Sequence, residues 1–147
     1  MTTAFASLQA ALLAAQSSAP APAGGNIGTN RLRPIPTGQS TALVLRLDAS
    51  EGTERVLGCV DWQTAFTVEC YARGATSAAD LVAAVDTLLA DTWARLAGLS
   101  FQALGADLIV DPRIDWQFDD GETPMVCAVI RLSAAHRTAS STLTPWS

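Results

Sequence analysis

The sequence contains no lysine, one histidine and three cysteines among its 147 residues. All nine basic residues are therefore arginine, and the formal net charge is −5 with a pI of about 4.6. A groove that grips nucleic acid needs clustered basic side chains, so this charge balance argues against such a groove. An acidic surface repels DNA, which is useful only in a channel through which DNA slides without sticking.

Cysteine and histidine are too few for the common metal sites. Cys59, Cys70 and Cys127 lie far apart without a C-x-x-C motif, and His136 alone cannot complete a zinc site. We expect three buried, reduced thiols in a cytoplasmic setting. No apolar run approaches the roughly 18 residues that span a bilayer. The N-terminal apolar stretch lacks a positive region and is interrupted by Gln9, so we expect a helix there, not a secretory signal.

Catalytic motifs are missing as well. The sequence has no G-x-S-x-G motif, P-loop or dinucleotide fingerprint. The carboxylates of residues 111–122 have the wrong spacing for a calcium loop, and we interpret them as a solvated turn between strands. His136 stands beside Arg137 near a strand end, where we expect a surface or interface role. We therefore expect no catalytic residue, no bound metal and no cofactor.

What the sequence does have is enough apolar residues, 49%, to build the core of one domain over residues 1–147. Apolar periodicity and turn residues predict an N-terminal helix and loop over 1–25, with the helix at 3–16, and a loose C-terminal tail over 139–147. Between them we expect a strand at 41–48, a polar turn with Gly52 at 49–53, a long strand at 56–72, a helix at 77–98, and strands at 106–118 and 123–137. In the helix we expect a buried stripe of Leu81, Val85, Leu88, Thr92 and Leu96.

This order of elements predicts an α+β fold: a mostly antiparallel four- to five-stranded sheet with two helices packed on one face. The strand at 56–72 would extend about 58 Å, whereas a compact domain of this length has a diameter of roughly 38 Å. Either Gly58 and Asp61 mark a bulge, or a long hairpin projects as an arm, which we favour. We expect Trp62, Trp93 and Trp116 in the core, and Trp146 could anchor an interface.

Three segments carry a resemblance to a known family. They are WQTAFTVECYARG at 62–74, the helix SAADLVAAVDTLLADTWARL at 77–96, and IDWQFDDGETPMVCAVIRLSAAHRT at 114–138. Their order resembles that of tail-terminator (minor tail) proteins of long-tailed, non-contractile bacteriophages. The three segments cover under half of the chain, and no catalytic signature defines the family. The proline-rich stretch 19–36 and the extended tail depart from its pattern.

The resemblance implies a structural virion protein, not an enzyme. Such proteins form a homohexameric ring on the head-proximal end of the tail tube, end tube polymerisation and join the tail to the head–tail connector protein. Genomic DNA passes through the ring without specific binding. The resemblance also implies assembly in the host bacterial cytoplasm, contacts with the tail tube protein, and no membrane partner.

Surface positions on the predicted hairpin and turns are the candidate contact residues. We expect inter-subunit contacts from Leu43, Leu45, Arg46, Arg55, Leu57, Trp62 and Phe66. We expect contacts with the tube or connector from Arg31, Arg33, Asp119, Asp120, Glu122 and Arg137. Two alternatives remain open: another neck component, such as a head–tail adaptor or tail-completion protein, or a small ligand-binding domain or enzyme that uses the carboxylates of 111–122.

Overall fold

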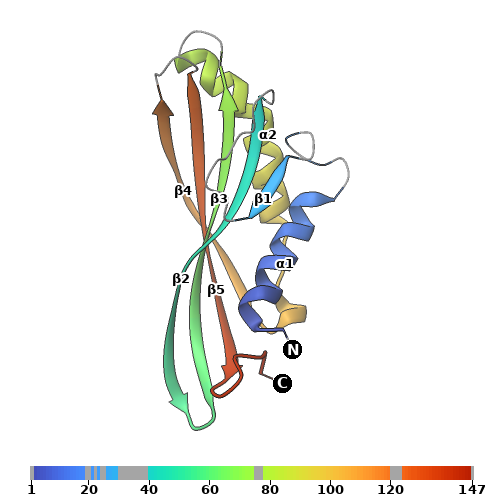
Figure 1. Ribbon diagram of the computed structural model, residues 1–147, viewed down its shortest axis with the longest axis vertical. Helices are drawn as coiled ribbons and strands as arrows, with labels where there is room; N and C mark the ends of the chain where they lie inside the picture. Colours follow the sequence, from blue (N-terminus) through green and yellow to red (C-terminus); the bar gives the residue numbers. More distant parts are fainter. Residues whose placement is uncertain are drawn as a thin grey trace.

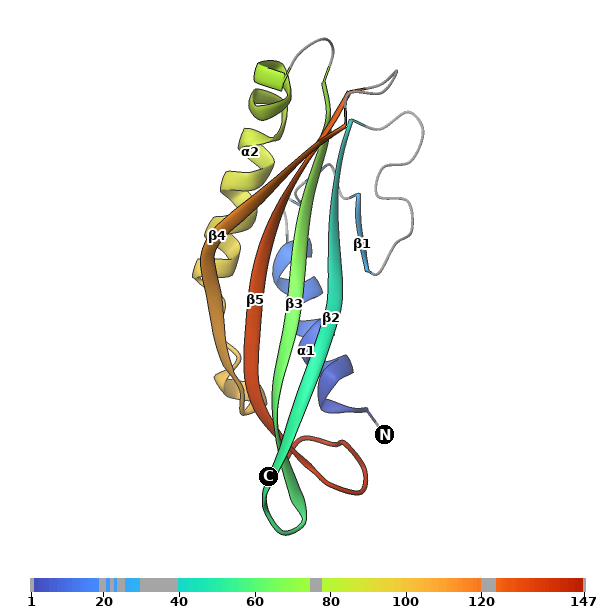
Figure 2. The same cartoon turned by 90° about the vertical axis from the view of Figure 1, so that its left-hand side faces the viewer.

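The computed structural model describes residues 2–18, 21, 23, 26–29, 40–74, 78–119 and 124–146. Within them the fold is α+β, with two α-helices and a five-stranded mixed sheet (Figure 1). The elements are α1 (Ala4–Ser17), β1 (Ile27–Thr29), β2 (Thr41–Val56), β3 (Cys59–Arg73), α2 (Ala78–Ala97), the 3-10 helix η2 (Gln102–Leu104), β4 (Asp107–Asp119) and β5 (Met125–Ala139). Both helices lie on one face of the sheet, and Figure 2 looks onto the other face.

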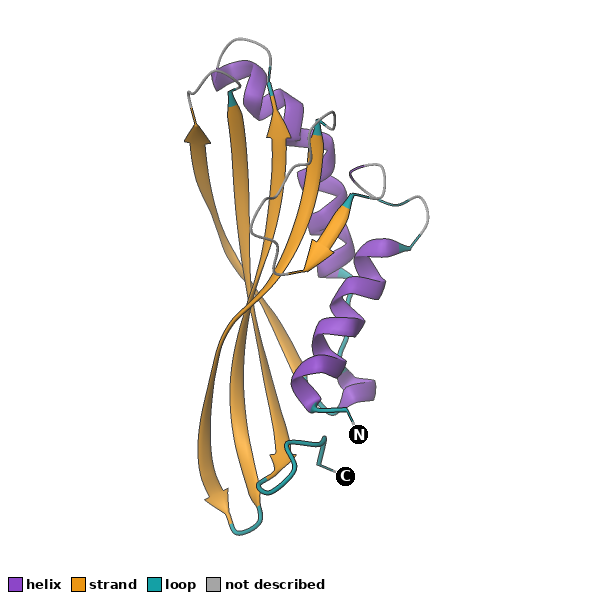
Figure 3. Cartoon of the chain, viewed as in Figure 1, coloured by secondary structure: helices purple, strands orange, loops and turns teal. Residues whose placement is uncertain are grey.

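The strand order across the sheet is β1-β2-β3-β5-β4. β1 pairs with β2 in parallel, from Ile27↔Leu43 to Thr29↔Leu45, whereas the other three strand pairs are antiparallel. The parallel pair makes the sheet mixed. The long strands twist strongly about one another, as Figure 3 shows, so the upper and lower halves of the sheet face different directions.

The hairpin between β2 and β3 turns at Leu57 and Gly58, so the predicted turn at 49–53 is wrong. Gly58 has a φ of +87°, a left-handed conformation that glycine adopts without steric cost. Gly52, the glycine on which the wrong prediction rested, lies inside β2 opposite Trp62. A Cβ atom there would come within 2.8 Å of the Trp62 ring, so this glycine makes room for the indole.

β5 accompanies β3 along its whole length, from Arg73↔Met125 to Cys59↔Ala139. The end of the molecule is therefore a ribbon of β2, β3 and β5, not an isolated two-stranded hairpin, and residues 107–109 of β4 pair with its inner part. We call this part the ribbon end, residues 49–65 and 133–139. β2 alone, with 16 residues at about 3.4 Å each, extends about 54 Å. Figure 1 shows the ribbon end reaching beyond the first turn of α1.

The core lies between the helices and the sheet. The apolar stripe predicted for α2 is buried at every position: Leu81, Val85, Leu88, Thr92 and Leu96. Leu8 and Leu12 of α1 cover the neighbouring part of the sheet, and Phe101 packs in after α2. Each such side chain contributes about 1.5–3 kcal/mol on burial. Neither helix is long and apolar enough to cross a membrane within the described residues.

The C-terminal segment is not the loose tail that the sequence predicted. It folds back on β5 through a bridge between Thr138 and Pro145, and the Trp146 amide donates to the Arg137 carbonyl at 3.0 Å. The Leu143 carbonyl accepts a 2.9 Å hydrogen bond from the amide of Ala4, the first residue of α1. The two ends of the described chain are therefore joined beside the ribbon end.

Candidate interaction surfaces

The helix-facing side of the ribbon end carries an aromatic cluster. Trp62 of β3 lies directly opposite His136 of β5. Phe5 of α1 packs edge-on against both rings, with centroid distances of 5.1 Å to Trp62 and 5.3 Å to His136. Phe5 is in the first turn of α1, so this cluster attaches the start of the helix to the ribbon end.

Hydrogen bonds continue from this cluster along the strands. His136 Nε2 lies 2.7 Å from Thr64 Oγ1, and Trp62 Nε1 donates to Thr138 Oγ1 at 2.9 Å. Ser50 of β2 shares a 3.0 Å hydrogen bond with Thr64. Thr64 is completely buried, so no substrate reaches the hydroxyl that His136 contacts. The pair is therefore structural, not a nucleophile and its base.

His136 is only 7% exposed, so its predicted surface role is wrong. Its Nδ1 atom is buried without a hydrogen-bond partner. Burial lowers the pKa of His136, because a charged imidazolium would lose its hydration there. Sequence patterns place His136 in a strand beside Arg137, but they do not show that Phe5, far away in the chain, covers the imidazole ring.

The opposite, open face of the sheet (Figure 2) carries ion pairs. Arg46 of β2 donates to Glu69 of β3 at 2.5 Å, and the Tyr71 hydroxyl donates to the same carboxylate. Burial acts to lower the pKa of Arg46, but the bonds to Glu69 and Tyr71 raise it overall. Beneath them, burial raises the pKa of the Cys127 thiol to about 12, which makes it a poor nucleophile.

Two further ion-pair groups lie on the open face. Asp115 of β4 accepts hydrogen bonds from Arg131 at 3.0 Å and from Arg113 at 2.9 Å, and these bonds lower the pKa of its carboxyl. Arg137 binds Asp61 through two guanidinium nitrogens near the ribbon end, which raises the pKa of Arg137. The carboxylate of Asp115 is thus already engaged by two arginines and is poorly suited to bind a cation.

The outer edge of β4 exposes an aromatic pair. Trp116 and Phe118 stack with a centroid distance of 6.4 Å and are 40% and 46% exposed. The prediction that Trp116 belongs to the core is therefore wrong. Both side chains point to the helix-covered face, but α2 packs mainly on β3 and β5 and leaves this edge strand largely uncovered. The sequence alone does not show which strand is the edge.

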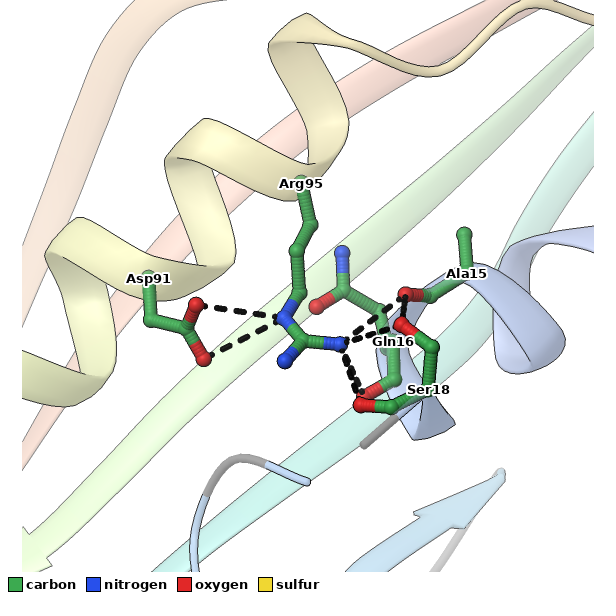
Figure 4. A network of polar contacts seen from close by, with 5 residues as sticks. All are labelled: Ala15, Gln16, Ser18, Asp91 and Arg95. Carbon is green, nitrogen blue, oxygen red and sulfur yellow. Dashed lines mark hydrogen bonds and ion pairs between the residues drawn. The ribbon is translucent and has the colours of Figure 1, made fainter. Parts of the chain in front are cut away.

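α1 is held at its far end by an arginine from α2 (Figure 4). Arg95 Nη1 donates to the carbonyls of Ala15, Gln16 and Ser18 at 3.2, 3.4 and 2.8 Å, and Asp91 holds its Nε at 3.2 Å. Ala15 and Gln16 lie in the last turn of α1 and Ser18 follows it, so their carbonyls have no partner within the helix. Arg95 therefore fixes α1 in place, and with it the Phe5 cluster at the other end.

The predicted inter-subunit residues fall into three groups. Leu43, Leu45 and Phe66 are buried under the helices and cannot reach another subunit, so their prediction is wrong. The alternation of β-strand side chains places them on the core face. Arg46 lies in its ion pair on the open face, Trp62 is half-buried, and Leu57 is exposed at the hairpin turn. The side chain of Arg55 is not described.

The predicted tube and connector residues are mostly not placed. Arg31, Arg33, Asp120 and Glu122 lie outside the described residues. Asp119 ends β4, and Arg137 lies in its ion pair with Asp61 at the ribbon end. Asp119 and Arg137 therefore belong to opposite ends of the sheet.

An open hollow of about 410 Å³ lies beside the ribbon end, lined by residues that include Glu51, Asp61 and Arg137. Within the described part of the chain, no three His, Cys, Asp or Glu side chains are grouped so as to hold a metal ion. No protein-family model matches the chain, and no curated protein is significantly similar to it. The surfaces themselves must carry any proposal about function.

Proposed function

We propose that the chain is a structural virion protein that forms a hexameric ring on the head-proximal end of a phage tail tube. There it ends tube polymerisation and joins the tail to the head–tail connector protein, with DNA passing through the ring. The observation that carries this proposal is the ribbon end. It reaches beyond α1, and Leu57 at its turn is 93% exposed.

An apolar residue at the tip of a hairpin is a natural contact for a neighbour. The flank of the ribbon end offers more: β1 pairs with β2 only as far as Leu45, and no described strand pairs with the outer edge of β2 at residues 49–56. Such an edge favours association with another chain. If the contact joins different patches of identical subunits, it is heterologous and closes into a ring at the right rotation.

Charge supports the proposed lumen. Residues 48–56 of β2 include three acidic side chains, Asp48, Glu51 and Glu54, and the whole chain has a net charge of −5. A bore with acidic side chains lets DNA pass without adhesion. The inter-subunit contacts that we propose are Arg46, Arg55, Leu57 and Trp62. Those with the tube or connector remain Arg31, Arg33, Asp119, Asp120, Glu122 and Arg137.

Light scattering and electron microscopy of the purified protein test the ring. We expect six-membered rings for the natural sequence and their loss in Leu57→Glu, because a charge at the tip would be buried in the contact. Val82→Glu is the matched control, since Val82 is also exposed but lies on α2. A strict monomer at high concentration that is also absent from virions would refute the proposal.

The phage itself provides the second test. Loss of the gene should give tails of uncontrolled length, whereas normal tails would rule out a terminator role. Another neck component, such as a head–tail adaptor or tail-completion protein, would share the ring but not this effect. The position of this protein in the virion distinguishes these roles, and we expect to find it below the connector and above the first tube ring.

A further inference from the structure

The first turn of α1 is attached to the ribbon end by uncharged contacts. The Phe5 ring packs edge-on against the ring of His136, with a centroid distance of 5.3 Å. The amide of Ala4 donates to the Leu143 carbonyl at 2.9 Å. No residue of α1, from Ala4 to Ser17, is charged. A response of this attachment to pH must therefore come from the residues beneath Phe5.

His136 is the titratable group beneath Phe5. Its Nε2 atom lies 2.7 Å from Thr64 Oγ1, and its Nδ1 atom is buried without a hydrogen-bond partner. A neutral imidazole carries one N–H, so with the proton on Nε2 the Nδ1 atom is a bare acceptor. The charged form carries an N–H at both positions. A protonated His136 therefore needs an acceptor at Nδ1 that this cluster does not supply among the described residues.

The charged side chains at the paired positions around His136 belong to the other face of the sheet. Asp61 and Arg137 bind each other there, and Glu51 of β2 and Asp107 of β4 point to the same open side. The described C-terminal residues 140–146 contain no charged side chain. Burial without a facing charge lowers the pKa of His136. Solvent is then the acceptor that a charged imidazole can use, and Phe5 covers the ring.

We propose that the first turn of α1 is a pH-sensitive latch, in which protonation of His136 releases Phe5 from the ribbon end. The step is a proton transfer from solvent to Nδ1, and no other covalent bond forms or breaks. The far end of α1 stays in place, because Arg95 holds the carbonyls of Ala15 and Ser18 at 3.2 and 2.8 Å. The helix therefore opens from its first turn only.

Release of Phe5 changes the surface of the ribbon end. Trp62 is half-buried, and Phe5 packs edge-on against its indole with a centroid distance of 5.1 Å. An open latch uncovers this ring for a neighbouring subunit, a consequence that rests on the proposed function. The release itself takes place within one chain, so it can be tested whether or not the protein forms rings.

Hydrogen–deuterium exchange, read by mass spectrometry on the natural protein, tests the latch. Exchange at residues 4–8 reports release, because the amides of Ala6 and Ser7 donate to Thr3 at 3.3 and 3.1 Å. Opening takes up one proton. If the exposed imidazole has its ordinary pKa of about 6.5 and the covered one does not titrate, protection should fall about eightfold between pH 7 and 5.5, after correction for intrinsic exchange. Residues 12–16, which Arg95 holds, are the internal control and should not change.

His136→Gln is the matched variant, because it keeps a polar side chain beside Thr64 but cannot titrate. Its first turn may exchange faster or slower than that of the natural protein, but its protection should be the same at both pH values. The latch is refuted by any of three results: no change in the natural protein, the same change in the variant, or an equal change throughout α1. Slower exchange in acid would also refute it, since a charged ring would then hold Phe5 more tightly.

Electron microscopy of the same samples separates this inference from the proposed function. Six-membered rings whose first turn shows no dependence on pH would overturn the latch and leave the ring intact. A protein that never forms rings, but whose residues 4–8 respond to pH through His136, would support the latch and count against the ring.

Discussion

Arg95 shows how one side chain can replace a missing local signal. α1 ends at Ser17 without a basic residue in its last turn, and the Ala15 carbonyl accepts a 3.3 Å hydrogen bond from the nearby Ser18 hydroxyl. A guanidinium from α2 supplies three of the needed hydrogen bonds, and its positive charge is favourable at the negative end of the helix dipole. The position of α1 therefore depends on a residue about eighty positions away.

Arg95→Met should lower the free energy of unfolding by about 2 kcal/mol, because partly buried carbonyls lose charge-assisted hydrogen bonds. Urea denaturation followed by circular dichroism measures this change in the free energy of unfolding. Arg113→Met is the control: this side chain also makes an ion pair, but it is largely exposed, and exposed pairs contribute little. Equal losses in the two variants would show that the contacts in Figure 4 do not stabilise the fold.

His136 makes stability depend on pH. Because burial holds its folded-state pKa below the ordinary value of about 6.5, the unfolded chain binds the proton more tightly than the folded one. Stability should therefore be complete above about pH 7 and fall as the pH decreases toward 5.5. Arg137 and Asp61, which are next to His136 and Trp62 in the two strands, are paired with each other on the opposite face.

Unfolding titrations between about pH 7 and 5.5, above the range of ordinary carboxyl groups, measure this dependence. His136→Gln keeps a polar side chain beside Thr64 but removes the titrating group. We expect a flatter pH profile for the variant, whatever its absolute stability. An unchanged slope would mean that other groups cause the dependence.

At the level of elements, the β2–β3 hairpin depends on a glycine inside a strand. A Cβ at Gly52 would meet the Trp62 ring, and the ring is held by Phe5 and Thr138. Gly52→Ala should displace the indole and lower stability by about 1–3 kcal/mol. Gly98→Ala is the matched control, since a Cβ there lies 3.6 Å from its nearest neighbour and should be tolerated. Tryptophan fluorescence and denaturation report both effects.

How far the sequence predicts an element depends on where its partners are. α2 could be predicted residue by residue, because its stripe from Leu81 to Leu96 follows from helix periodicity alone. The hairpin turn could not, since Gly52 and Gly58 look alike in sequence and only the Trp62 ring distinguishes them. The exposure of Trp116 and burial of His136 depend on strand order and on α1, which are long-range properties.

At the scale of the whole molecule, the two chain ends stabilise each other. The segment after β5 returns to α1 through the Leu143 carbonyl and to β5 through the Trp146 amide. Deleting residues 140–147 should loosen the first turn of α1, because Ala4 loses its partner. Hydrogen exchange should then rise for residues 4–8 while the centre of β3 stays protected. Unchanged exchange in α1 would show that the Phe5 cluster alone holds the helix.

The joined ends also determine what a genetic label can report. A fluorescent protein or epitope attached near residue 2 or residue 146 would emerge beside the same extremity of the sheet, next to the hairpin turn. In micrographs of an assembly, either label would therefore mark which way that extremity points, inward to a bore or outward. Labels at the two positions should give superimposable densities, so a pair of fusions serves as an internal check on orientation.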